Sequence, residues 1–97
     1  MRRVIVTYKL KRERVAEHEA LIAAVFGELE KRGTGGIRYG AFKQPDGVSY
    51  AHIAFVEGDQ NPLQAIEAFK AFTAKVEERC EVPPTVTDLT TVGAYRI

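Results

Sequence analysis

The stretch VSYAHIAFVE, from Val48 to Glu57, decides the fold of this chain. Its β-branched and aromatic residues predict a strand, whose side chains alternate between two faces. Both faces are largely apolar: one set is Ala51, Ile53 and Phe55, and the other is Tyr50, His52, Ala54 and Val56. An antiparallel sheet with one face in water would alternate apolar with polar residues. We therefore expect both faces of this strand to be covered.

The rest of the chain predicts a strand–helix–strand unit on each side of a hairpin at Asp46-Gly47. Dense β-branched and aromatic residues predict four strands: Val4 to Leu10, Ile37 to Lys43, Val48 to Glu57, and Thr85 to Tyr95. Apolar residues at helical spacing predict two helices: about Arg14 to Arg32, and Asn61 to Cys80. Glycines after Arg32 end the first helix, and Pro83-Pro84 prevents the second from continuing.

This order, βαββαβ, is the ferredoxin-like pattern of the α+β class. Right-handed crossovers place both helices on one face of a four-stranded antiparallel sheet, within a single domain over residues 1–97. The helices leave the second apolar face without a cover. A second copy of the sheet is the economical cover, which predicts a homodimer in the form of a dimeric α/β barrel. The alternative is an open cleft for a ligand.

Composition excludes several classes of protein. With 14 basic and 13 acidic residues the net charge is +1, which gives no electrostatic case for binding nucleic acid or an anionic membrane. No apolar run approaches the ~18 residues of a membrane span. The single cysteine, Cys80, excludes an internal disulfide and fits a reducing compartment. We expect a soluble, cytoplasmic protein.

His52 is the best candidate for chemistry, because a histidine titrates near neutrality and can act as a general acid or base. Tyr50 lies two residues away, on the same face of the strand, and would be its hydrogen-bonding partner. The pair could take a proton from an acidic phenol or ketone. The alternative is a buried histidine that is satisfied by a structural partner.

Further residues are candidates for binding a substrate. Arg38 would hold a carboxylate or enolate oxygen through its fork of donors, although a salt bridge or plain exposure is an alternative. Tyr8, Tyr39 and Thr7 would line the cavity by position, or belong to the core or the strand surface.

No metal site or cofactor site is expected. The two histidines lie on different elements without an acidic partner at ligand spacing, and His18 falls on the apolar stripe of the first helix, where packing is the simpler role. Cys80 closes the stripe of the second helix and is expected in the core. The glycines after the first helix do not have the spacing of a phosphate-binding loop.

Several segments together resemble a known family. They are the strand end Tyr8-Lys9-Leu10-Lys11, a glutamate-rich first helix, Gly36-Ile37-Arg38-Tyr39 and the hairpin Asp46-Gly47. The pattern is similar to the antibiotic biosynthesis monooxygenase-type members of the dimeric α/β barrel superfamily. The resemblance implies a pocket between helix layer and sheet, or at the barrel mouth. It also implies cofactor-free oxygenation of polycyclic phenols, quinol oxygenation or haem degradation, and in the wider superfamily cyclase or isomerase activity.

The chain departs from the haem-degrading branch, which uses an asparagine on the first strand and a tryptophan and a histidine on the second helix. This chain has no tryptophan, and its single asparagine, Asn61, is a helix cap. Three hypotheses remain. They are a cofactor-free monooxygenase acting on an aromatic or polyketide-like small molecule with His52 as base, a cyclase or isomerase using the same pair, and a non-catalytic binding or dimerisation module.

Overall fold

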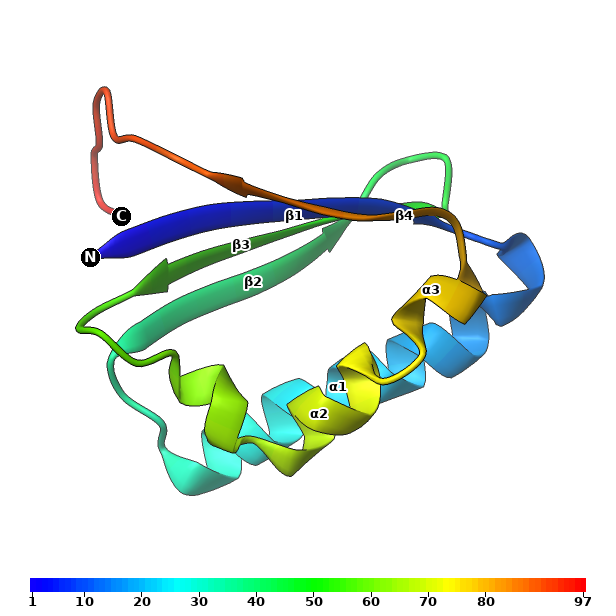
Figure 1. Cartoon of the computed structure of the whole chain (residues 1–97), viewed down its shortest axis with the longest axis horizontal. Coiled ribbons are helices and arrows are strands. Elements are labelled where there is room, and N and C mark those ends of the chain that lie inside the picture. The colour runs from blue at the N-terminus through cyan, green and yellow to red at the C-terminus, as the bar shows by residue number, and fades with distance from the viewer.

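The computed structural model describes residues 1–97 and confirms the ferredoxin-like fold. Its strands are β1 (Arg2–Leu10), β2 (Ile37–Lys43), β3 (Ser49–Val56) and β4 (Cys80–Asp88), and its helices are α1 (Val15–Arg32), α2 (Glu67–Thr73) and α3 (Val76–Arg79). Short 3-10 turns, η1 (Arg12–Arg14) and η2 (Pro62–Ala65), precede α1 and α2. The sheet is antiparallel in the order β2-β3-β1-β4, and all the helices lie on one of its faces (Figure 1).

Turn residues end α1 and build the hairpin as the sequence predicts. Gly33 takes a left-handed backbone at φ 60°, where its N–H donates to the carbonyl oxygen of Glu30. In the hairpin, Gly47 has φ 79°, and the carboxylate of Asp46 accepts hydrogen bonds from the backbone N–H groups of Val48 and Ser49. Both positions use the freedom of glycine to adopt positive φ without a Cβ clash.

The predicted continuous helix from Asn61 to Cys80 is wrong, because the backbone leaves the helical region twice. Ile66 is extended at φ −92° and ψ 113°, and its side chain is buried. Lys75 takes a left-handed conformation at φ 57°, between α2 and α3. The buried guanidinium of Arg79 stabilises this second break by donating to the carbonyl oxygens of Phe72 and Ala74 at the end of α2.

The last strand also begins earlier than predicted: β4 runs from Cys80 to Asp88, and no strand continues to Tyr95. Pro83 and Pro84 therefore lie inside a strand. This is tolerated because β4 is an edge strand and its register against β1 shifts between Thr7 and Lys9, next to the prolines.

The two apolar faces of β3 have different surroundings. The face with Tyr50, His52, Ala54 and Val56 is buried under the helices. The opposite face, with Ala51, Ile53 and Phe55, is half-buried and has no helix layer (Figure 1). Ile53 pairs with Ile5 of β1 on this face, so the apolar row extends across two strands. The two-sided pattern is confirmed, and the homodimer that would cover the second face stays a prediction.

Candidate functional site

His52 lies near the middle of β3 and points into the space between sheet and helices. Its side chain is buried, and both ring nitrogens are within hydrogen-bond distance of a tyrosine hydroxyl. Nε2 is 2.7 Å from the hydroxyl of Tyr8 on β1, and Nδ1 is 2.6 Å from the hydroxyl of Tyr39 on β2. The ring of Phe72 stacks on the imidazole at 5.6 Å between centroids. His52 is thus held between two phenols in an apolar enclosure.

The hydrogen-bonded network continues from Tyr8 into the helix layer. The Tyr8 hydroxyl is 2.6 Å from Nε2 of His18 on α1, and Nε of Arg79 on α3 donates to Nδ1 of His18 at 3.1 Å. Both His18 and Arg79 are buried. No buried side-chain nitrogen or oxygen of the chain lacks a hydrogen-bond partner. One continuous network therefore joins Arg79, His18, Tyr8, His52 and Tyr39.

Burial keeps the four rings of this network uncharged at neutral pH. It lowers the pKa of His52 to about 4. It also lowers the pKa of His18 to about 4, with smaller contributions from the nearby Arg79 and His52. Burial raises the pKa of Tyr39 to about 12 and that of Tyr8 further still. The guanidinium of Arg79 is then the only charge in the network, since arginine does not deprotonate in proteins.

Tyr50 shares the buried face with His52 but is not its hydrogen-bonding partner. Its hydroxyl donates to Oε2 of Glu19 at 2.5 Å, and Lys43 donates to the same oxygen at 2.8 Å. The ring of Tyr50 stacks on Tyr8 at 5.3 Å. Burial, together with the Glu19 carboxylate, raises the pKa of Tyr50. Tyr8 and Tyr39 take the place next to His52 that the sequence suggested for Tyr50.

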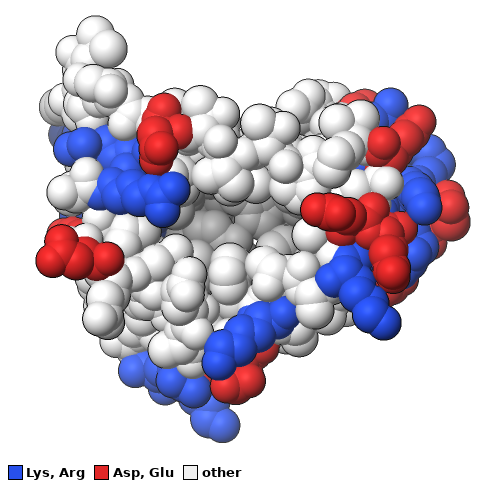
Figure 2. All heavy atoms as spheres, in the orientation of Figure 1, with Lys and Arg blue, Asp and Glu red and all other residues white.

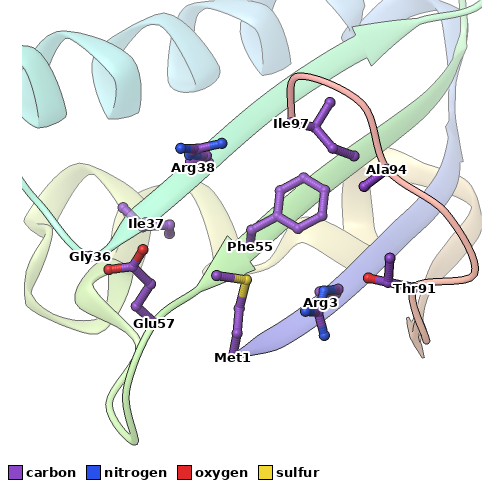
Figure 3. Close-up of a pocket in the computed structure, with 10 residues that line it drawn as sticks. All are labelled: Met1, Arg3, Gly36, Ile37, Arg38, Phe55, Glu57, Thr91, Ala94 and Ile97. Atoms are coloured by element: carbon purple, nitrogen blue, oxygen red, sulfur yellow. The ribbon is translucent and has the colours of Figure 1, made fainter.

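Arg38 and Thr7 lie on the opposite face of the sheet from His52, so they cannot share a cavity with it inside one subunit. Arg38 pairs with Phe55, and Thr7 pairs with Ala51, both on the face without helices. Arg38 lines a cavity of about 360 Å³ there, together with residues of β1, β3 and the C-terminal segment (Figure 3). Arg38 and Thr7 lie on this face because side chains alternate along a strand. Arg38 therefore points away from the face of Tyr39, and Thr7 away from the face of Tyr8.

Tyr39 also forms part of the wall of a cavity between α1 and β2. This cavity has a volume of about 330 Å³, and its lining includes Phe26, Leu29, Glu30 and Ile37. The ring of Phe26 stacks on Tyr39 at 5.1 Å with an interplanar angle of 7°. The volume is in the range that holds a small aromatic ligand. Glu30 is the one charged side chain in the lining of this cavity. On the face shown in Figure 2, the hollowed centre is uncharged, and Lys, Arg, Asp and Glu side chains lie around it.

His18 and Arg79 belong to the network, although the sequence pattern pointed to neither as a site residue. His18 lies on the buried side of α1, as its position on the apolar stripe predicts, but its ring nitrogens bind Tyr8 and Arg79. Arg79 is preceded by two glutamates and resembles an exposed helix end by sequence. One sequence feature could have indicated both residues: His18 lies on the apolar stripe of the first predicted helix, and Arg79 lies beside the stripe of the second. Cys80 is buried, as predicted.

No group of three histidine, cysteine, aspartate or glutamate side chains is placed to hold a metal ion. No helix has the length and the apolar character that crossing a bilayer requires.

Comparison with known proteins gives matches by structure and none by sequence. No protein-family model and no curated protein matches the sequence. A crystal structure of an antibiotic biosynthesis monooxygenase superposes with a TM-score of 0.74 over 96% of this chain and 100% of the other, at 18% identity. The chain has the fold of the antibiotic biosynthesis monooxygenases. The predicted resemblance is thereby confirmed at the level of the fold.

Other structures support the same conclusion. The protein Rv0793 from Mycobacterium tuberculosis matches with a TM-score of 0.70, at 18% identity, over 96% of each chain. SnoaB from Streptomyces nogalater, named as a cofactor-independent oxygenase, matches with a TM-score of 0.67, at 16% identity, over 99% of this chain and 97% of its own. At these identities the likeness to antibiotic biosynthesis monooxygenases concerns the backbone, and the chemistry depends on His52 and its neighbours.

Proposed function

We propose that this protein is a cofactor-independent enzyme that oxygenates a small phenolic or enolisable aromatic molecule. The observation that carries the proposal is the position of His52, buried between the hydroxyls of Tyr8 and Tyr39, with Tyr39 in the wall of a cavity. The fold shared with SnoaB, which is named as a cofactor-independent oxygenase, favours oxygenation over other reactions of an activated phenol.

The His52–Tyr39 pair would act on the oxygen of the substrate. A hydroxyl of Tyr39 that hydrogen-bonds a phenolate or enolate oxygen stabilises the negative charge that the substrate develops. The carbanion form of an activated CH₂ group then reacts with O₂ and a proton to give a hydroperoxide, and loss of water leaves a ketone. In balance, CH₂ and O₂ become C=O and H₂O. His52 acts through Tyr39: its Nδ1, 2.6 Å from the Tyr39 hydroxyl, holds that hydroxyl in place and polarises it.

The apolar surroundings suit this chemistry, because each hydrogen bond is stronger where water is excluded. Phe26 stacks on Tyr39, and Phe72 stacks on His52. A planar aromatic substrate would lie along the ring of Phe26, with its oxygen toward Tyr39.

Oxygen uptake tests the proposal directly. Anthrones, naphthols and hydroquinones are offered to the purified protein in an oxygen electrode, and consumption of one O₂ per substrate molecule is expected for one class. Tyr39→Phe should lower kcat by roughly 10²- to 10³-fold, the usual effect of removing one oxyanion donor. Tyr95→Phe is the matched control, because Tyr95 is exposed and distant in sequence from the network.

The outcomes separate the three hypotheses. Turnover without oxygen uptake would contradict oxygenation and identify a cyclase or isomerase. Binding without turnover for every class would identify a non-catalytic binding module. Full activity of a His52→Gln variant would remove His52 from the mechanism.

We also propose that the protein is a homodimer, formed through the sheet face that the helices leave open. Ile5 and Ile53 pair on that face, and Phe42 is exposed on it. Covering this surface contributes ~25 cal/mol for each Å² of apolar area that leaves water. Sedimentation velocity should give twice the mass of the chain. Ile53→Lys should shift the protein to a monomer and Ala24→Lys, on the exposed side of α1, should not.

A further inference from the structure

The network from Arg79 to Tyr39 contains more hydrogens than contacts. Four contacts join its five side chains: Arg79 to His18, His18 to Tyr8, Tyr8 to His52, and His52 to Tyr39. The four contacts form one line of hydrogen bonds from Arg79 to Tyr39. Each of the five side chains contributes one hydrogen atom to this line when both histidines are neutral. Five hydrogens for four contacts leave one hydrogen without a partner in the protein.

Arg79 determines the direction at one end of the line. Its Nε can only donate, so Nδ1 of His18 must accept and the single hydrogen of a neutral His18 must be on Nε2. That hydrogen is donated to the oxygen of Tyr8. The opposite direction would place two hydrogens between Arg79 and His18.

The remaining hydrogen belongs either to Tyr8 or to Tyr39. If His52 carried its hydrogen on Nε2, the hydroxyl hydrogen of Tyr8 would be left over, deep in the core where Tyr8 is 4% exposed. An unpaired donor in such a place is costly. If Tyr8 instead donates to Nε2 of His52, then His52 carries its hydrogen on Nδ1 and donates to Tyr39. The unpaired hydrogen is then on Tyr39, which lines the cavity between α1 and β2.

We propose that Arg79 is a positioning residue that fixes the tautomers of His18 and His52 and thereby makes Tyr39 a hydrogen-bond donor to the cavity. The cavity therefore selects an aromatic ligand with an anionic or carbonyl oxygen. This proposal rests on the proposed function for the place of the ligand, and on the network alone for the tautomers. Every donor in the line is polarised in one direction, from the guanidinium toward the cavity, and such chains strengthen their last hydrogen bond. The flanking ring of Phe26 fits an aromatic ring, and the free phenolic hydrogen fits its oxygen, while the one charged side chain of the lining is the carboxylate of Glu30.

The tautomers can be measured without any substrate. Two-bond ¹⁵N–¹H correlation spectra of protein labelled at histidine nitrogen show which ring nitrogen carries the hydrogen. The expected result is hydrogen on Nε2 of His18 and on Nδ1 of His52. Arg79→Gln, whose amide can donate or accept, should give a mixture of tautomers in both rings, and Arg79→Lys, which keeps a donor, should restore the original pair.

Tyr8→Phe provides a second variant that leaves Arg79 in place. It cuts the line between the two histidines, so His18 should keep its tautomer while His52 loses its preference for Nδ1. A His52 ring with hydrogen on Nε2 in the unaltered protein would overturn the proposal. So would tautomers of His52 that stay unchanged in both Arg79→Gln and Tyr8→Phe.

The selectivity of the cavity is tested with 4-nitrophenolate as the probe, with nitrobenzene as its counterpart that lacks the oxyanion. Tyr39→Phe should weaken binding of 4-nitrophenolate by roughly 10- to 100-fold, the effect of losing a hydrogen bond to a charged group. Binding of nitrobenzene should change little. Equal losses for both probes, or no binding of 4-nitrophenolate, would overturn the assigned ligand class. Oxygen uptake is measured separately, so this failure is distinct from a failure of the proposed oxygenation.

Discussion

Acidification from about pH 7.5 to about pH 5 is expected to remove about 4 kcal/mol from the free energy of unfolding, through His18 and His52 alone. Both histidines are buried, and burial lowers their pKa from 6.5 to about 4. Below pH 6.5 the unfolded chain binds protons on these rings, whereas the folded chain does not bind them until the pH approaches 4. The stability is therefore present above pH 6.5 and falls as the pH falls.

The magnitude follows from the difference in bound protons. Each pH unit in this window removes up to about 1.4 kcal/mol per histidine, which comes to about 2 kcal/mol for each ring between pH 7.5 and pH 5. A small domain has about 5–15 kcal/mol in total, so the loss is a large fraction of it. The chain has only two histidines, and its carboxylates titrate in the unfolded state mainly below pH 5.

Urea unfolding followed by circular dichroism at a series of pH values measures this slope. The matched control is a variant with both His18→Gln and His52→Gln, which keeps polar partners for Tyr8 but cannot titrate in this window. It should be less stable at neutral pH and nearly independent of pH down to about 5. A free energy of unfolding that is equal at both pH values in the unaltered protein, or a slope that persists in the double variant, would refute the reasoning.

Three further predictions concern single side chains. Tyr8→Phe leaves two buried histidine nitrogens without a partner and should cost about 2–5 kcal/mol in urea unfolding, against about 0.5 kcal/mol or less for the exposed Tyr95→Phe. Gly27→Ala, in the open middle of α1, should stabilise the protein by about 0.5–1 kcal/mol, whereas Gly33→Ala, at φ 60°, should destabilise it by about 1 kcal/mol. Thermal unfolding checks the pair, because the two variants should shift the melting temperature in opposite directions. The thiol of Cys80 is buried and its pKa is raised by burial, so it should react with a thiol reagent only as fast as the protein opens, and rapid labelling of the native protein would contradict its place in the core.

The first three strands and the first helix could be predicted because local composition determines them, whereas the last strand begins and ends earlier than predicted. The predicted strand from Ile37 to Lys43 matches β2, and the predicted first helix begins one residue before α1. The breaks at Ile66 and Lys75 could not be predicted, because both residues are compatible with a helix by sequence. What holds these breaks is tertiary packing: Ile66 is buried in the core, and Arg79, four residues after Lys75, is buried against His18 of α1.

The site was predictable in part. The alternation along β3 places Tyr50 and His52 on the same face, and the structure agrees. The same rule could have separated Arg38 from Tyr39 and Thr7 from Tyr8, since neighbours in a strand point to opposite faces. Which hydroxyl reaches His52 depends on the strand register and on helix packing, neither of which a single sequence specifies.

The prolines of β4 have a consequence for the behaviour of the protein at high concentration. Pro83 and Pro84 lack the N–H groups that another strand would need, and they lie at an edge of the sheet. An edge interrupted in this way is a poor template for the addition of further chains. The assembly of copies should therefore stop at a defined size on this side, and β2, the other edge, is where fibre growth would have to begin.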